Sequence, residues 1–439
     1  MAINSSDNVV HLNEVIVAMV PFPEYSHLSQ LFILARFIAS HNIPVHLLCL
    51  ADQSQTFKQR VQDGLEVSNI HFDDLSLPSE TEGTGDADND LPSITFLLKK
   101  LSEPICRTCV ELSTNAKRLV IIHDNPMRTS IGDVLSFPDV ESYIFHYVPA
   151  FTRYSLFRQC TDIVDGDHDK MLQQLQDEFP MMESCFGPYM AMFVKMEREW
   201  TLNSGEFINS CREVEGKYLY LLVNESTHNK PLWAIGPLHM LLLESHDSSS
   251  STTRHECLAF LDEQDVNSVI FIAFGTNTKF SQDQVNELAL GLEQSNHKFI
   301  WVLREADKKM DTENVKGKMG TLNCQKGGFL SHCGWNSCLE SISMGVPIAA
   351  WPNNADQPYN AVFVTNVLKI GISVWSWAQR EELMTAAAVE KSVKTLMGST
   401  EGEGMRQRAV ELSNKIKNSV SHGGLARKEM ESFISYITR

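Results

Sequence analysis

The segment 327–360 places several polar side chains at the start of a predicted helix. It reads GGFLSHCGWNSCLESISMGVPIAAWPNNADQPYN and predicts a strand that ends at His332, a sharp turn at Gly334 and a helix from about Asn336. The free backbone N–H groups and the positive dipole at such a helix start suit a phosphate or diphosphate. His332 and Ser337 add side-chain donors at the same place. We expect an anion-binding crevice here, and an ordinary capped turn is the competing interpretation.

Three further polar residues of this segment could bind the hydroxyl groups of a sugar. Glu340 lies about one helical turn beyond Asn336. Asp356 and Gln357 begin the next predicted helix, which is expected to end near Gly371 and comes directly after the predicted strand PIAAWP. Carboxylates accept hydrogen bonds and amides both accept and donate them, which is what a polyol requires. The sequence therefore predicts a hydroxylated ligand beside the anion.

A second candidate site lies in the first half of the chain. His27 follows the first predicted strand and begins the first predicted helix, which places it at the crevice of an α/β sheet. A helix N-terminus disfavours the imidazolium form, so the ring stays neutral and can accept a proton. Asp124 ends the predicted strand RLVIIHD. One histidine among fifteen is more often structural than catalytic, and both interpretations stay open on this evidence.

Strands and helices alternate in both halves of the chain and must position these residues. EVIVAMVPF, PVHLLCL, RLVIIHD and ESYIFHYVPAF predict buried strands in the first half, and SVIFIAFG, KFIWVL, GGFLSH and PIAAWP in the second. Ser281 is a predicted helix N-cap. The pattern predicts two doubly wound α/β domains, at 1–240 and 255–425. A serine- and threonine-rich tract at 241–254 is the expected linker, and 426–439 a C-terminal helix.

Length and composition narrow the class of protein. The 439 residues exceed what one hydrophobic core usually supports. The formal charge of −18 argues against nucleic acid or an anionic membrane as a partner. The start of the chain lacks a signal-peptide pattern, and no apolar run is long enough to span a bilayer. Ten cysteines in this context predict reduced thiols, and the C-x-x-C of Cys106 and Cys109 is interpreted as structural rather than as a metal or redox site, so we expect a cytoplasmic protein.

The segment 327–360 closely resembles the signature box of plant family 1 UDP-glycosyltransferases. H-C-G-W-N-S, the following glutamate and the later D-Q pair have the family's order and spacing. VPFPEYSHLSQLFILAR, VIIHD and GLEQSNHKFIWVLREADK look most like the zeatin O-glucosyltransferase branch. The resemblance covers nearly the whole chain. It implies a GT-B fold, in which two Rossmann-like domains face a cleft and the C-terminal helix packs back on the first, acceptor-binding domain.

Carried over residue by residue, the resemblance implies a UDP-sugar site in the second domain. Its donor-binding residues would be Thr276, His332, Trp335, Asn336, Ser337, Glu340, Asp356 and Gln357. Glu340 would bind the ribose, Asp356 and Gln357 the sugar, and the others the diphosphate, Trp335 and Asn336 through their backbone. A glutamine at the last position favours UDP-glucose, and members of the branch can also use UDP-xylose.

The resemblance also implies the reaction. His27 would be the general base and Asp124 would orient it, in an inverting transfer of the sugar to a hydroxyl of a small lipophilic acceptor such as a zeatin-type cytokinin. The helix start would stabilise the leaving diphosphate, so no metal cofactor is expected. Asp86, Asp88 and Asp90 form a D-x-D-like pattern, which we interpret as a solvated loop.

The family pattern is broken between Trp301 and His332. The family's box begins with a tryptophan and a P-Q pair eighteen residues before the histidine, where this chain has Asn314. One strand, a sheet edge by analogy with the family's fold, and its helix are expected to be absent, together with the ring that stacks on uracil. Loss of this stacking would cost about 1–3 kcal/mol of binding free energy. Ser26 also replaces the usual glycine. A catalytically impaired or inactive ligand-binding relative is therefore the main alternative, whereas the lack of G-x-G-x-x-G disfavours a nicotinamide-dependent oxidoreductase.

Overall fold

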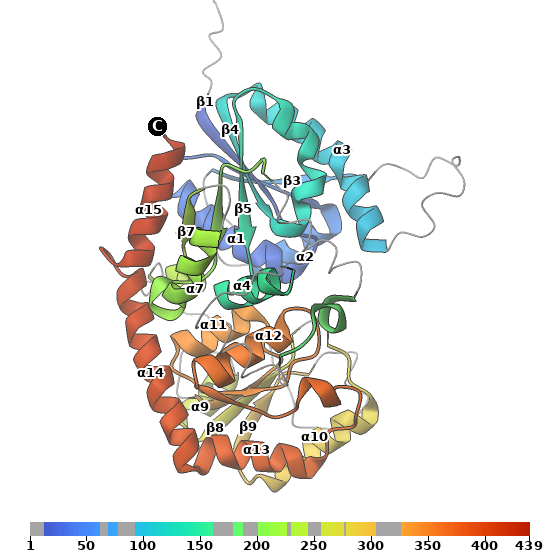
Figure 1. Ribbon diagram of the computed structural model, residues 1–439, viewed down its shortest axis with the longest axis vertical. Coiled ribbons are helices and arrows are strands. Elements are labelled where there is room, and N and C mark those ends of the chain that lie inside the picture. The colour runs from blue at the N-terminus through green and yellow to red at the C-terminus, as the bar shows by residue number, and fades with distance from the viewer. Residues whose placement is uncertain are drawn as a thin grey trace, which may run out of the picture.

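The structure is a computed structural model and consists of two α/β lobes stacked along the long axis (Figure 1). The residues that it describes are 13–61, 69–77, 93–160, 179–187, 201–225, 230–244, 256–275, 278–303 and 326–439. Each lobe is built around one sheet, and every described strand pair in both sheets is parallel. The sequence prediction of doubly wound α/β domains is thereby confirmed.

The first sheet has seven strands in the order β3-β2-β1-β4-β5-β6-β7. Their bounds are β1 Asn13–Val20, β2 Val45–Leu50, β3 Ile70–Leu75, β4 Ala116–Asp124, β5 Val140–His146, β6 Gly205–Ile208 and β7 Leu232–Ala234. The strand order reverses between β1 and β4, and open α/β sheets bind ligands at the carboxyl ends of the strands beside such a reversal. His27 follows β1 and Asp124 ends β4, so the topology brings the two residues together.

The second sheet has five strands in the order β12-β11-β10-β8-β9. Their bounds are β8 Val269–Ala273, β9 Lys298–Trp301, β10 Lys326–Ser331, β11 Ile348–Ala350 and β12 Gly371–Ser373. Here the order reverses between β8 and β10. Among the described residues β9 is the edge of the sheet, where the family resemblance led us to expect a missing strand. Asn314 and the rest of 304–325 lie outside the described residues, so this expectation stays a prediction.

Helices cover the faces of both sheets (Figure 1). The α-helices are α1 Tyr25–Ala39, α2 Ala51–Val61, α3 Ser93–Ser113, α4 Ala150–Gln159, α7 Arg212–Glu225, α8 His239–Glu244, α9 Glu256–Asp262, α10 Gln282–Gln294, α11 Trp335–Ser343, α12 Gln357–Val362, α13 Ala386–Gly398, α14 Thr400–Val420 and α15 Leu425–Ile437. Shorter 3-10 helices are η1 Asn125–Ser130, η2 Gly132–Ser136 and η5 Trp377–Gln379, and η4 Phe363–Val367 is a short π-helix.

Local sequence signals predicted most helix starts correctly and some ends less well. The Ser281 hydroxyl accepts a hydrogen bond from the Gln284 N–H at 3.2 Å and so caps α10, as predicted. The strand predicted in ESYIFHYVPAF is too long, because β5 ends at His146 and Pro149 caps α4. The helix predicted to end near Gly371 is also too long. Helix α12 ends at Val362 and passes into the short π-helix η4.

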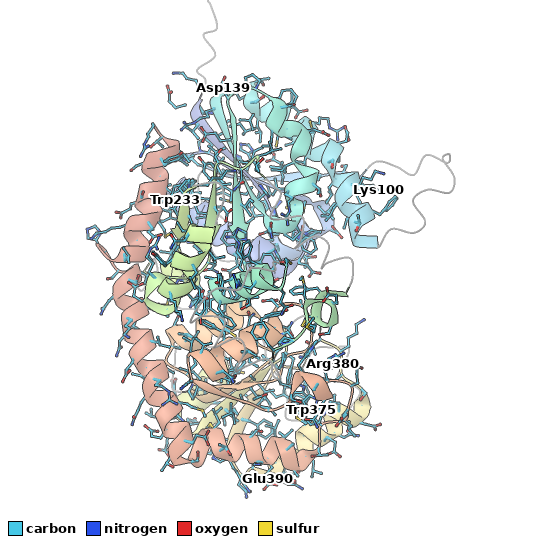
Figure 2. All side chains as sticks on the ribbon, viewed as in Figure 1. Lys100, Asp139, Trp233, Trp375, Arg380 and Glu390 are labelled. Atoms are coloured by element: carbon cyan, nitrogen blue, oxygen red, sulfur yellow. The ribbon has the colours of Figure 1, made fainter. Side chains whose placement is uncertain are left out.

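The end of the chain joins the two lobes. In Figure 1, α14 lies along the second lobe and α15 continues along the first. Phe433 of α15 packs edge-on against Phe207 of β6, with 4.4 Å between the ring centroids, and contacts Trp233 of β7, which Figure 2 labels beside this helix. A carboxylate oxygen of Glu429 accepts the backbone N–H of Ala234 at 2.6 Å. Helix α15 therefore belongs to the core of the first lobe, although it follows the second lobe in sequence.

The structure bears differently on the remaining expectations, which concern the linker, the D-x-D-like pattern, the cysteines and membrane spans. The linker expected at 241–254 is described only as far as Glu244, which ends α8. Asp86, Asp88 and Asp90 lie outside the described residues. Cys106 and Cys109 lie inside α3, and the described residues contain no group of three or more potential metal ligands. No described helix has the length and apolar character needed to cross a membrane.

A buried carboxylate holds the start of α4, the helix that leads from β5 to the interface between the lobes. Glu215 is 1% exposed and accepts the backbone N–H groups of Ala150 at 3.0 Å and Phe151 at 2.8 Å. Burial raises the pKa of this carboxyl to about 7. The helix N-terminus and its two donors favour the ionised form, but the loss of hydration outweighs them.

This carboxyl predicts a pH dependence of stability. Its folded pKa lies above its ordinary value near 4.5, so between about pH 4.5 and 7 the folded state binds the proton more tightly than the unfolded state. The free energy of unfolding should therefore fall as the pH rises through this window, by about 3 kcal/mol from this group. Glu215→Gln removes the titration. Denaturant unfolding at pH 5 and pH 8 should show a smaller drop in the variant, and equal drops would contradict the assignment.

Candidate functional site

A histidine–aspartate pair lies at the reversal point of the first sheet. His27 Nδ1 is 2.9 Å from Asp124 Oδ2, and the same oxygen accepts the backbone N–H of Phe22 at 2.6 Å. Asp124 is fully buried and His27 is 9% exposed. An ionised carboxylate can only accept hydrogen bonds, so the proton of the neutral imidazole must be on Nδ1. The other ring nitrogen, Nε2, is then a lone-pair acceptor, which is the form that a general base requires.

Aromatic rings hold the imidazole in place. The Tyr147 ring meets His27 edge-on with 4.0 Å between the centroids, and Phe22 lies 5.2 Å away. Phe22 comes from the loop after β1, and Tyr147 from the loop after β5. Both loops leave the carboxyl ends of their strands. The pair therefore has one polar contact that fixes its tautomer and apolar contacts that limit its rotation.

In the second lobe, the turn between β10 and α11 leaves a helix N-terminus open. Cys333 has φ +63°, and Gly334, the residue before the helix, provides no side chain to cap it. A Cβ atom at Gly334 would lie 2.6 Å from His332 Nε2, and a Cβ at Gly275 would lie 2.7 Å from the same atom, so a side chain at either position would force this ring to move. The free N–H groups of α11 point out of this turn and can bind an anion.

His332 is neutral in this environment. Burial lowers the pKa of its imidazole to about 4, so near neutral pH the ring can exchange hydrogen bonds but carries no charge. The buried side-chain oxygen of Asn336, in the first turn of α11, has no hydrogen-bond partner among the described residues, whereas the His332 ring bonds to the backbone of Ala273. Because buried polar groups are normally paired, the Asn336 oxygen is available to a ligand.

The helix starts of the two lobes meet. The side-chain nitrogen of Asn336 lies 3.5 Å from the backbone oxygen of Ser26, the residue directly before His27. Trp335 also crosses the interface: its indole N–H donates to the Asn209 carbonyl at 2.7 Å, so this side chain joins the lobes. His27 and the start of α11 therefore lie next to each other across the interface between the lobes.

Asp356 lies at the same junction, at the start of α12. Burial raises the pKa of its carboxyl to about 6, and the nearby His27 acts in the opposite direction. Gln357 has turned its amide toward its own loop, where its oxygen accepts the N–H groups of Asn353 at 2.9 Å and Asn354 at 3.2 Å. Within the described part of the chain, Asp356 is thus near the histidine, whereas the polar atoms of Gln357 are engaged locally.

The remaining predicted donor-binding residues are Ser337, Glu340 and Thr276. Ser337 is half-buried in the first turn of α11. Glu340 is exposed one turn further along the same helix. Thr276, in the loop after β8, lies outside the described residues. The structure thus brings together His27, Asp124, His332, Asn336 and Asp356, with Ser337 beside them.

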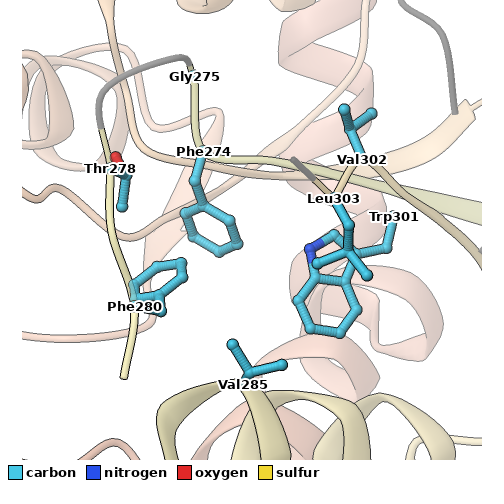
Figure 3. A pocket seen from close by; sticks show the side chains of 8 residues that line it. All are labelled: Phe274, Gly275, Thr278, Phe280, Val285, Trp301, Val302 and Leu303. Atoms are coloured by element: carbon cyan, nitrogen blue, oxygen red, sulfur yellow. The ribbon is translucent and has the colours of Figure 1, made fainter. Parts of the chain in front are cut away.

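A small pocket adjoins this site at the ends of β8 and β9, and no sequence motif indicated it. Its walls include Phe274 and Phe280 on one side and Trp301 on the other (Figure 3). Gly275 lines the pocket, and a Cβ atom there would lie 2.7 Å from His332 Nε2, so this wall of the pocket lies beside the turn before α11. Figure 3 shows the indole nitrogen of Trp301 on the side of the ring that faces Phe274. The pocket therefore offers flat apolar walls and one N–H donor.

Sequence reasoning also missed Asn360. This fully buried residue of α12 donates to the Asp356 carboxylate at 2.6 Å and to the Cys333 carbonyl at 2.9 Å. Its position four residues after Asp356 in a predicted helix was the available signal, because residues i and i+4 share a helix face. Tyr147 had no comparable signal.

Comparison with known proteins agrees with this geometry. Residues 13–240 match the family profile "Glycosyltransferase, N-terminal domain", and residues 244–415 match "UDP-glucoronosyl and UDP-glucosyl transferase". The zeatin O-glucosyltransferase of Phaseolus lunatus is 39% identical and the zeatin O-xylosyltransferase of Phaseolus vulgaris 36% identical, each over 100% of both chains.

Solved structures show the same fold. A UDP-glucosyltransferase from Polygonum tinctorium superposes with a TM-score of 0.79 at 21% identity, covering 97% of this chain and 99% of that one. Phytolacca americana UGT2, complexed with UDP-2fluoro-glucose and pterostilbene, gives a TM-score of 0.75 at 24% identity. The fold is GT-B, and with two matched domains and full-length relatives the chain belongs to the UDP-glycosyltransferase family.

Proposed function

We propose that the protein transfers glucose or xylose from a UDP-sugar to a hydroxyl group of a small lipophilic acceptor such as a zeatin-type cytokinin. The observation that carries this proposal is the contact between the start of α1, whose His27 pairs with Asp124 at the end of β4, and the open N-terminus of α11. The relatives are named as zeatin O-glucosyl- and O-xylosyltransferases, which supports this acceptor class and both sugars. They give no support to the non-catalytic alternative.

In the proposed reaction, His27 removes the proton from the acceptor hydroxyl. The oxygen attacks the anomeric carbon from the face opposite to UDP, a new C–O bond forms, and the bond to the diphosphate breaks with inversion. Asp124 stabilises the imidazolium that forms, and the proton then passes to solvent. The α11 N–H groups, with Ser337 and the neutral His332, stabilise the charge that develops on the leaving diphosphate.

We place the sugar and the ribose of the donor on opposite sides of the diphosphate. Asp356, beside His27, accepts hydrogen bonds from the sugar, and Gln357 does so once its amide turns away from its loop. Thr276 assists at the diphosphate, and Glu340 on α11 holds the ribose. The acceptor lies against Phe22 and Tyr147, whose rings flank the base. A cytoplasmic location stays a prediction from the sequence.

The pocket at Trp301 is our proposed site for the uracil ring. It adjoins the diphosphate site through Gly275, and its aromatic walls suit a planar base. The indole N–H of Trp301 can donate to a uracil carbonyl. This pocket would replace the stacking tryptophan that the family carries where this chain has Asn314.

The catalytic assignment predicts the effect of His27→Ala. Losing the base should lower acceptor-dependent UDP release about 100-fold or more, with UDP affinity unchanged. The assay uses UDP-glucose and UDP-xylose with zeatin as acceptor. His46→Ala is the matched control, because His46 Nδ1 also pairs with an aspartate, Asp73, at 2.8 Å, but on β2 and β3. Full activity of the His27 variant would disprove the assignment.

The uracil assignment predicts a selective effect of Trp301→Phe. This change keeps an aromatic ring but removes the N–H donor, so the dissociation constant for UDP should rise about fivefold to tenfold. Trp351→Phe is the matched control, because Trp351 packs on Phe274 and Phe280 at 5.2 and 5.3 Å but does not line the pocket. Calorimetry should separate the two variants, and equal UDP affinities would refute the pocket.

The sugar-binding role of Asp356 predicts a pH limb in donor affinity. Its pKa of about 6 means that the carboxylate becomes protonated below this pH and loses capacity to accept from sugar hydroxyls. The dissociation constant for UDP-glucose should therefore rise as the pH falls from 7 to 5, and Asp356→Asn should bind weakly at both values. Calorimetry of both proteins tests this, and a parallel pH profile in the variant would argue against the role.

A further inference from the structure

Asn360 connects three parts of the molecule that lie far apart in sequence. Its side-chain nitrogen donates to Asp356 Oδ2 at 2.6 Å and to the Cys333 carbonyl at 2.9 Å. Its side-chain oxygen accepts the hydroxyl of Thr152, on α4 of the first lobe, at 2.8 Å. Asn360 and Thr152 are both fully buried. One amide therefore bonds to the sugar-side carboxylate, to the turn before α11 and to the opposite lobe.

The chemistry of these partners determines the orientation of the amide. A carboxylate and a carbonyl only accept hydrogen bonds, so the NH₂ group must face Asp356 and Cys333, and the amide oxygen must face Thr152. Both N–H donors are then used. Asparagine is the side chain of this size that offers two donors and one acceptor in such an arrangement. Aspartate would place a second carboxylate against Asp356, and leucine would leave three buried polar groups unpaired.

Each of the three bonds acts on a group that the donor needs. The Cys333 carbonyl belongs to a residue in the left-handed conformation, φ +63°, directly between His332 and Gly334. Holding this carbonyl keeps the turn in the shape that opens the start of α11. The bond to Asp356 aims its carboxylate and lowers the pKa of that group against the effect of burial. The bond from Thr152 fixes the positions of the Cys333 carbonyl and the Asp356 carboxylate relative to α4. This helix begins three residues after Tyr147, a neighbour of His27.

We propose that Asn360 is a positioning residue that sets the donor sugar and diphosphate in register with the catalytic base of the other lobe through its bond with Thr152. This inference rests on the proposed function. Transfer requires the anomeric carbon to lie in line with the activated acceptor oxygen, and small misplacements reduce the rate strongly. The Thr152–Asn360 bond should therefore contribute to the catalytic step more than to the affinity for UDP, which lacks the sugar.

Thr152→Val tests the bond between the lobes while conserving the volume of the side chain. We expect kcat for transfer from UDP-glucose to fall about tenfold, with the dissociation constant for UDP within twofold of the unchanged protein. Thr152→Ser keeps the hydroxyl and should restore kcat. Ser155→Ala is the matched control, because Ser155 is buried in the same helix, and among the described residues its hydroxyl bonds only to the Phe151 carbonyl of α4, at 2.7 Å.

Asn360→Ala tests the other two bonds. Affinity for UDP-glucose should fall about tenfold more than affinity for UDP. Loss of the donor to Asp356 also raises the pKa of that carboxyl, so the acid limb of UDP-glucose binding should move to higher pH. A change in packing alone would not produce this shift of the pH profile.

The outcomes separate the inference from the function on which it rests. If Thr152→Val has the same kcat as Ser155→Ala, or if Thr152→Ser loses as much activity as Thr152→Val, the positioning role is wrong while the proposed function stands. If the unchanged protein neither binds UDP-glucose nor releases UDP, the proposed function fails and the inference fails with it. A tenfold loss confined to Thr152→Val and an acid limb moved upward in Asn360→Ala would support it.

Discussion

The open N-terminus of α11 is the feature on which the site depends. Its first N–H groups have no partner within the helix, and Gly334 supplies no capping side chain, so these donors are left for a ligand. The residues of the turn before α11 keep these N–H groups accessible. Glycines at 275 and 334 admit the His332 ring, and the left-handed Cys333 turns the chain sharply into the helix. The chain carries a net charge of −18, so the proposed diphosphate site relies on local donors of this kind rather than on a basic surface.

Burial determines the protonation states at this junction. Desolvation keeps His332 neutral and raises the pKa of Asp356, whereas the Asp124 contact sets the tautomer of His27. Neutral imidazoles exchange hydrogen bonds without repelling nearby donors, and a carboxyl that ionises near pH 6 is readily available to sugar hydroxyls. In the proposed reaction, the charge that develops during transfer is thus met by oriented dipoles and hydrogen bonds rather than by fixed positive charges.

The interface between the lobes has both structural and functional roles. Phe151 of the first lobe stacks on Phe363 of the second with 5.0 Å between the centroids, and the Trp335 indole reaches Asn209. Helix α15 adds a second connection by packing in the core of the first lobe. Because the proposed base and the proposed diphosphate site lie on different lobes, these contacts are part of the geometry of the proposed site. Glu215 holds the start of α4, the helix that carries Phe151 to the interface.

The sequence by itself determined the fold class, most strands and the candidate residues at strand ends, because hydrophobic periodicity and turn residues are local signals. It indicated His27, Asp124 and the segment around His332, since motif spacing places them after strands. Only the tertiary structure decided that Asn336 meets Ser26, that Gln357 bonds to its own loop, that Trp301 lines a pocket, and that Asn360 joins both lobes. These contacts join residues from separate elements or depend on rotamers, and neither sequence spacing nor periodicity encodes which side chains meet across an interface.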